Sequence, residues 1–131
     1  MYSFPKAGVM MTVVIVCAVA CCMIVGHELA HVATTVLVGG RFDGVVFRHV
    51  WAVGVRIRID HLTPTQVFWT LAAAPLAELG ILGSATLFDP TLSSLFLVMG
   101  LAQWGLNLVP WPGLPNDGHR MWAILRGRSC V

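Results

Sequence analysis

The chain has 131 residues, of which 57% are hydrophobic and only 11% are charged. Soluble domains carry about 25% charged residues, so this composition predicts a membrane protein and excludes an ordinary soluble domain. The length suits one domain, and the net charge is only +2, with the arginines spread over predicted loops. We therefore expect a lipid bilayer around the chain and no nucleic acid as a partner.

The first predicted element is a membrane span over residues 9–38, which is long for a bilayer and should tilt or protrude on one side. Residues 26–31 within it read Gly-His-Glu-Leu-Ala-His, the H-E-x-x-H pattern of zinc metallopeptidases. On a helix, His27 and His31 project from one face and can bind one metal ion, and Glu28 is placed to take a proton from water. Because ionisable side chains are costly in a bilayer, the pattern indicates a functional site.

Two simpler interpretations of this run are open. The histidines can be a buried pair that holds helices together, with Glu28 as their partner. Lys6 followed by an apolar run also resembles a signal peptide, but the run continues past the small residues at 18–20 that would offer a cleavage site. We expect the cysteines of this run to act as small apolar side chains rather than as metal ligands. They are Cys17, Cys21 and Cys22.

A short β-ribbon is predicted over residues 41–60, after the first span. Residues 55–60 alternate strictly between apolar and polar side chains, which favours a strand with Ile57 in its middle. Residues 42–46 can supply the partner strand. The alternative is a solvated amphipathic loop, because short runs of this kind are ambiguous.

The second span is predicted over residues 64–87. Thr63 and Gln66 have the spacing of a capping box, and a proline occupies the first helical position between them. Pro75 lies inside the span and should kink it.

The third span is predicted over residues 91–109, with Asp89 as its capping residue and a proline directly after it. Residues 110–131 are then expected to form a loop and tail, because prolines forbid a regular helix at the start of this segment. The predicted fold is a single membrane α-helical domain: three transmembrane helices with a short β-hairpin between the first two.

The distribution of charge predicts the orientation. The ribbon region and the C-terminal tail both carry several arginines, whereas the other side has only Lys6 and the turn at Asp89. By the positive-inside rule, the arginine-rich side faces the cytoplasm. We expect a multi-pass protein of the plasma membrane of a prokaryote, with its N-terminus outside and its C-terminus in the cytoplasm.

A hydrolytic zinc site takes three protein ligands and leaves a fourth position for water, so one ligand is needed besides His27 and His31. Asp117 is the only carboxylate after Asp89, and it follows a proline-broken segment that can fold back towards the metal. Glu78 is a lone acid in the second span and should face the interior. It can accept a hydrogen bond from a ligand histidine, or it can sit protonated against a helix carbonyl.

The pattern at residues 26–31, together with Asn107, Pro110 and the Asp-Gly pair at 117–118, resembles the site-2 protease family of intramembrane metalloproteases. Residues 73–77 also resemble the proline-bearing middle helix of that family, and the likeness covers most of the chain. The resemblance implies one zinc ion per chain and a catalytic base at Glu28, with three ligands: His27, His31 and Asp117. It further implies that Asn107 lines the substrate path and that the 41–60 ribbon, including Ile57, pairs with an extended substrate.

The chain departs from the family pattern at several positions. Glu78 stands where the family often has asparagine, Ala74 replaces a usual glycine, and His119 replaces a second glycine after the Asp-Gly pair. The stretch between Pro110 and Asp117 is also longer than usual. His119 can be a spare ligand, an oxyanion stabiliser or a surface histidine, and the surface position is favoured.

The predicted activity is zinc-dependent hydrolysis of a peptide bond in or near a transmembrane segment of a membrane-protein substrate. Glu28 would take a proton from water and pass it to the leaving amine. Two alternatives keep the metal ligands without the reaction: a zinc-handling or transport protein, and a regulatory pseudoprotease that binds transmembrane segments. In either of these, Glu28→Gln would change no cleavage product.

Overall fold

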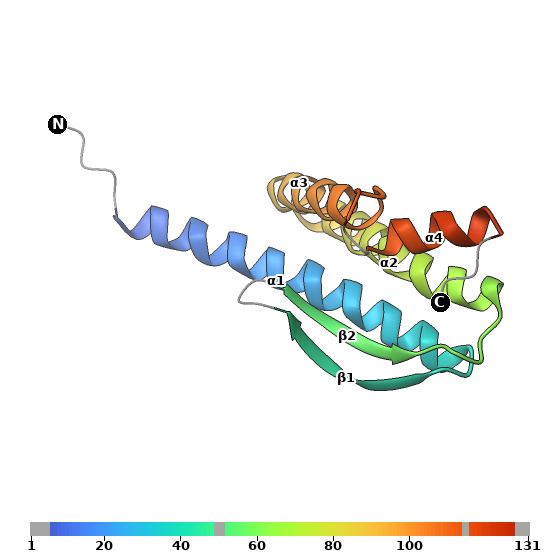
Figure 1. Cartoon of the computed structure of the whole chain (residues 1–131). Coiled ribbons are helices and arrows are strands. Elements are labelled where there is room, and N and C mark those ends of the chain that lie inside the picture. The colour runs from blue at the N-terminus through green and yellow to red at the C-terminus, as the bar shows by residue number, and fades with distance from the viewer. Residues whose placement is uncertain (1–5, 49–51, 114–115, 128–131) are drawn as a thin grey trace.

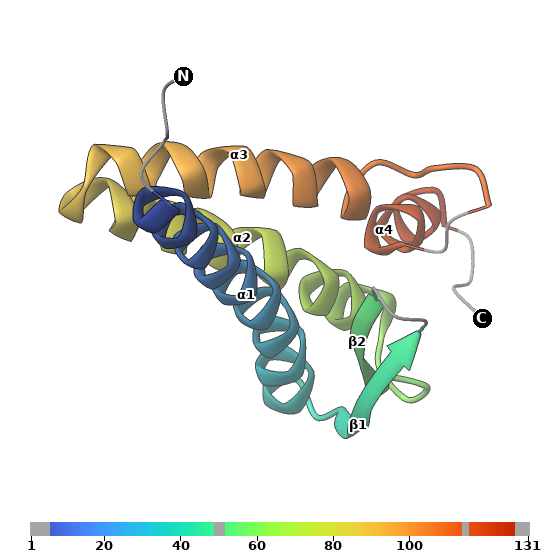
Figure 2. The ribbon, with the colours of Figure 1, turned by 90° about the vertical axis from the view of Figure 1, so that its left-hand side faces the viewer.

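The computed structural model describes residues 6–48, 52–113 and 116–127, and this part of the chain is mostly helical. The elements in chain order are α1 (Lys6–Leu37), β1 (Arg41–Arg48), β2 (Ala52–Arg58), α2 (Pro64–Phe88), α3 (Pro90–Asn107) and α4 (Asp117–Leu125). Figures 1 and 2 show α3 and the β-hairpin on opposite sides of the pair formed by α1 and α2. The short helix α4 lies near the start of α2.

One narrow stripe of α1 is buried, and most of its remaining surface is exposed. The buried positions recur every four residues: Val19, Met23, His27, His31 and Thr35. This spacing keeps the side chains on one face of the helix. The helices approach closely at Gly26, where a β-carbon would lie 2.7 Å from the Cδ1 atom of Ile81 in α2. The stripe therefore turns both histidines towards α2.

The exposed surface of α1 is largely apolar, and several polar side chains are buried together with apolar ones between α1 and α2. Glu78 and Thr70 of α2 are 0% exposed, whereas the apolar side chains of Val25 and Leu29 are 54% and 60% exposed. Two described helices are long and apolar enough to cross a membrane, namely α1 from Gly8 onwards and the whole of α2. An apolar exterior around polar groups is the arrangement expected where lipid is the solvent.

The third expected span corresponds to α3, which ends two residues before the predicted boundary. Among the described helices, α3 is not one of those that meet the length and hydropathy requirements of a membrane span. Serines near its start and Gln103 near its end reduce its apolar character. That α3 crosses the membrane therefore stays a prediction.

Capping residues set the ends of α2 and α3 close to the predicted positions. At the start of α2, the Thr63 side chain accepts a hydrogen bond from the Gln66 N–H, and the Gln66 side chain accepts one from the Thr63 N–H. Asp89 ends α2 and caps α3, because its carboxylate accepts hydrogen bonds from the backbone of Thr91 and Leu92. The helix α2 continues through Pro75.

The predicted hairpin is confirmed, and the alternative of a solvated loop is wrong. The strands β1 and β2 pair in antiparallel fashion, with Val45 opposite Val55. A bulge between Phe42 and Gly44 shifts the register, and Gly44 adopts a φ of 131°, which favours glycine. Both strands differ from the predicted bounds of 42–46 and 55–60. Pairing runs from Arg41 opposite Arg58 to Arg48 opposite Ala52, so β2 begins before the alternating pattern and ends two residues before its predicted end. The connection at residues 49–51 lies outside the described residues.

The predicted loop over residues 110–131 contains a helix that the sequence analysis did not anticipate. Its capping residue is Asn116, whose Oδ1 atom accepts a hydrogen bond from the His119 N–H at 3.0 Å. The Nδ2 atom of Asn116 donates to the carbonyl oxygens of Leu106 and Val109, each at 2.6 Å. The start of α4 is thereby tied to the end of α3. Prolines end α3, as predicted, but a capping residue after them starts a new helix.

The close approach of α4 to α3 requires glycine at position 118. A β-carbon on Gly118 would overlap the carbonyl oxygen of Leu108, a backbone atom that cannot rotate away. We expect Gly118→Ala to destabilise the protein by about 1–3 kcal/mol, measured as a lower midpoint of thermal unfolding in detergent. The control is Gly105→Ala, because a β-carbon there meets nothing within 4 Å. Equal midpoints for both variants would contradict this packing.

Candidate metal centre

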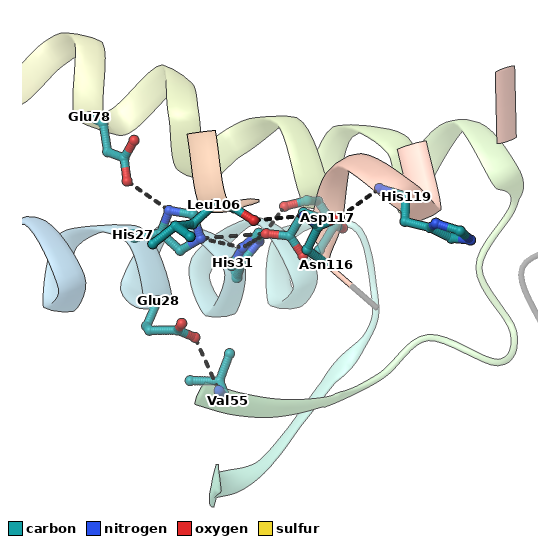
Figure 3. A network of polar contacts seen from close by, with 10 residues as sticks. His27, Glu28, His31, Val55, Glu78, Leu106, Asn116, Asp117 and His119 are labelled. Atoms are coloured by element: carbon teal, nitrogen blue, oxygen red, sulfur yellow. Dashed lines mark hydrogen bonds and ion pairs between the residues drawn. The ribbon is translucent and has the colours of Figure 1, made fainter. Parts of the chain in front are cut away.

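Three potential ligand atoms from α1 and α4 lie together, as Figure 3 shows. The Nε2 atoms of His27 and His31 are 3.2 Å apart. The Oδ2 atom of Asp117 lies 2.9 Å from Nε2 of His31 and 3.4 Å from Nε2 of His27. The three residues predicted as metal ligands are therefore the ones that the fold brings into one cluster.

Both imidazole rings are held in place by α2. The Nδ1 atom of His27 lies 2.8 Å from Oε1 of Glu78, and the Nδ1 atom of His31 lies 2.8 Å from the backbone carbonyl oxygen of Thr70. These contacts occupy one nitrogen of each ring and direct the other nitrogen towards Asp117. Hydrogen bonds of this kind fix the tautomer and the ring orientation of histidines that bind metals.

The hydrogen bonds to α2 leave the lone pairs of the His27 and His31 Nε2 atoms facing each other and the Asp117 carboxylate. A carbonyl oxygen can only accept, so Nδ1 of His31 carries the proton that bonds Thr70, and Nε2 of the neutral ring carries a lone pair. The same holds for His27 when its Nδ1 donates to the Glu78 carboxylate. Two such nitrogens and the Asp117 carboxylate repel one another unless a proton or a cation lies between them. The donor set therefore fits a metal ion.

The spacing of these atoms also suits a small tetrahedral ion. Zinc binds imidazole nitrogen and carboxylate oxygen at about 2.0–2.1 Å, which places tetrahedral ligand atoms roughly 3.3–3.4 Å apart. The separations of 3.2, 2.9 and 3.4 Å in the cluster lie close to this value. Three protein ligands leave a fourth position open, as in catalytic zinc sites and unlike the closed structural ones.

The carboxyl group of Asp117 belongs to the cluster, and that of Glu78 lies beside it against His27. Glu78 is 0% exposed, and its Oε2 atom has no hydrogen-bond partner among the described residues. Burial would raise the pKa of the Asp117 carboxyl. When a proton lies between the histidine nitrogens and Asp117, the hydrogen bonds and positive charge of His27 and His31 outweigh burial and hold this pKa below its usual range. Asp117 is thus kept in the ionised form that binds metals. Since buried charge is costly when unpaired, a cation at the cluster would offset both carboxylates.

Glu28 lies beside the cluster, but its carboxylate is turned towards the hairpin. The Oε2 atom accepts a hydrogen bond from the backbone N–H of Val55 in β2 at 3.0 Å. Figure 3 shows this carboxylate and that of Glu78 on opposite sides of α1. The side chain of Glu28 is half-buried. A carboxylate next to a metal site can act as a general base, and in this structure its partner is a backbone donor.

The other predicted site residues lie outside the ligand cluster. The side chain of His119 is exposed, as favoured from the sequence. Its backbone N–H donates a hydrogen bond to the side chain of Asn116, the capping residue of α4. Asn107 is the half-buried last residue of α3. Ile57 is paired with Phe42 in the hairpin. A role for Asn107, His119 or Ile57 in substrate binding stays a prediction.

Three further residues build the site and were not predicted from the sequence. Thr70 and Val55 contribute backbone atoms, so their side chains carry no signal of the contact. Asn116 sets the start of α4. A signal for Asn116 was present, because asparagine is a preferred capping residue and it directly precedes an acidic residue, which is favoured in the first turn of a helix.

Comparisons with family models, with curated proteins and with solved structures found no match to this chain.

The ligand cluster predicts that metal binding depends on Asp117. Replacing it with alanine leaves two histidines, so we expect Asp117→Ala to lose most of its bound zinc, measured by elemental analysis of protein purified in detergent. His119→Ala is the matched control, because this exposed histidine lies two residues away on the same helix. Full zinc in Asp117→Ala would remove Asp117 from the ligand set, and loss of zinc in both variants would point to unfolding of α4.

Proposed function

We propose that the protein is a zinc-dependent intramembrane endopeptidase that hydrolyses a peptide bond in or near a transmembrane segment of a membrane-protein substrate. The observation that carries the proposal is the convergence of the Nε2 atoms of His27 and His31 with the Asp117 carboxylate, next to Glu28. This combination provides three ligands, an open fourth position and a neighbouring base. Catalytic zinc sites have this composition.

Zinc is the metal that best suits these ligands. Two imidazole nitrogens and one carboxylate oxygen form a borderline donor set that zinc accepts in tetrahedral geometry. Magnesium and calcium favour sites made of oxygen ligands, so the two histidines argue against them. The resemblance of residues 26–31 and 117–118 to the site-2 protease family points to the same metal and the same ligands.

Each residue of the centre has a part in the proposed reaction. Zinc held by His27, His31 and Asp117 would polarise the scissile carbonyl and make a water molecule more acidic. Glu28 would accept a proton from water as its oxygen adds to the carbonyl carbon, and would deliver that proton to the leaving amine. Glu78 and the Thr70 carbonyl hold the two histidines in the tautomer that leaves Nε2 free for the metal.

A membrane location is supported by the distribution of polar side chains. His27, His31 and Glu78 are buried between α1 and α2, Asp117 is half-buried, and most of the exposed side chains of α1 are apolar. We propose that α1, α2 and α3 all cross the plasma membrane of a prokaryote, with the arginine-rich hairpin and tail on the cytoplasmic side. Water would then reach the metal from the cytoplasm.

The substrate is proposed to bind in an extended form. A peptide bond within a helix is protected because its carbonyl group is already hydrogen-bonded, so the substrate has to unwind. An exposed strand edge can stabilise the unwound segment by backbone pairing. The strand β2 is the candidate, because Val55 lies within hydrogen-bond distance of the proposed base.

A second function, metal or substrate binding without hydrolysis, is favoured by one observation. In this structure Glu28 bonds to Val55 rather than facing the three ligands. A zinc-handling protein or a regulatory pseudoprotease would have no need of a free base at this position.

Substitution of the base separates these functions. Glu28→Gln keeps the size of the side chain and removes its basicity, so we expect bound zinc to be unchanged and cleavage to fall by at least about 100-fold. The measurement is the ratio of cut to uncut product for co-expressed single-span membrane proteins, together with zinc content. Equal cleavage by Glu28→Gln and the unchanged protein would refute the proposed mechanism. Absence of cleavage by the unchanged protein across such a set would favour the binding function.

A further inference from the structure

The edge of β2 that does not pair with β1 is bonded to the proposed catalytic base. In an antiparallel pair, successive backbone N–H groups of a strand point alternately towards the partner strand and away from it. The Val55 N–H points away from β1, because it donates to Oε2 of Glu28. By this alternation, the N–H groups of residues 53 and 57 lie on the same outer edge. Glu28 therefore bonds at the centre of the edge that would receive an extended peptide.

A single N–H group cannot serve two acceptors equally well in the same geometry. A peptide strand that pairs with β2 needs the Val55 N–H for one of its own carbonyl oxygens. The Glu28 carboxylate holds that donor at 3.0 Å in this structure. Strand pairing at Val55 and the bond between Glu28 and Val55 thus exclude each other.

We propose that the bond between Glu28 and the Val55 N–H is a latch that an extended peptide opens when it adds to the edge of β2. The incoming carbonyl oxygen takes over the Val55 N–H and releases the Glu28 carboxylate beside the histidine ligands. This inference rests on the proposed function, in which the released carboxylate is the base. The latch keeps Glu28 away from water near the metal until a peptide occupies the edge.

The position of Glu28 in the chain suits this exchange. It directly follows the ligand His27 on α1, so a carboxylate that leaves the strand is still beside the metal centre. The neighbouring Gly54 in β2 has open space around it and no β-carbon to hinder the approach of a peptide. A half-buried Glu28 is also accessible enough to change partners.

Two variants of Glu28 that lack the base test the latch through peptide binding, with no cleavage of the peptide. Glu28→Gln keeps an oxygen that can accept the Val55 N–H, whereas Glu28→Ala has no acceptor; neither has a base. The probe is a short fluorescent peptide of alternating valine and serine, titrated into each zinc-loaded protein in detergent micelles. We expect Glu28→Ala to bind the peptide about five-fold more tightly than Glu28→Gln, which corresponds to the net value of one hydrogen bond.

A second substitution in the strand shows whether Val55 carries the effect. Val55→Pro removes the N–H from a strand edge, where proline is tolerated, and Gly54 before it relieves the usual clash. In the Val55→Pro background the two Glu28 variants should bind the peptide equally. Ile57→Pro is the matched control, because it removes an N–H of the same edge that Glu28 does not use, and there the five-fold difference should persist.

Three results would overturn the latch. These are equal binding by Glu28→Ala and Glu28→Gln, a difference that persists in Val55→Pro, and no peptide binding by any variant. All of these readouts concern binding, so a failure of the proposed hydrolysis would be recognised separately, by the cleavage measurement on the unchanged protein.

Discussion

The structure depends on two hydrogen bonds by which α2 holds the imidazole rings of α1. The Glu78 carboxylate and the Thr70 carbonyl occupy the Nδ1 atoms of His27 and His31, at 2.8 Å each. This leaves both Nε2 atoms facing the same point, where Asp117 completes the cluster. Without the contacts from α2 the rings could rotate, and the four-residue spacing on α1 alone would not define a site.

The same contacts explain why a polar interior is tolerated inside an apolar exterior. Each buried polar side chain is costly unless it is paired, and Glu78 is buried completely. Glu78 pairs with His27 and the Thr70 carbonyl pairs with His31, and a proton or cation between the Nε2 atoms and Asp117 joins these groups in one network. A cation in the cluster would neutralise the negative charge of the carboxylates, so metal binding and packing of the helices should depend on each other.

Much of this arrangement follows from the sequence, and the remainder depends on backbone atoms. The H-E-x-x-H spacing predicts the two histidines on one helix face, and the scarcity of carboxylates predicts Asp117 as their partner. The contacts of Thr70 and Val55 could not be predicted, because backbone groups exist at every residue and only the fold selects them. The helix α4 was not predicted, because the prolines that precede it outweighed the capping signal of Asn116. The span over α3 rests on sequence alone, since its serines and Gln103 lower its apolar character.

The central claim, that α1 and α4 together bind one zinc ion through two histidines and an aspartate, is tested most directly by X-ray absorption at the zinc edge. Zinc bound by His27, His31 and Asp117 should show a first shell of nitrogen and oxygen at about 2.0–2.1 Å, with the outer-shell scattering of two imidazole rings. In Asp117→Ala protein that retains residual zinc, the imidazole scattering should persist while the carboxylate contribution is lost. A sulfur shell at about 2.3 Å, which would point to the cysteines of α1, or scattering from a single imidazole would contradict the account.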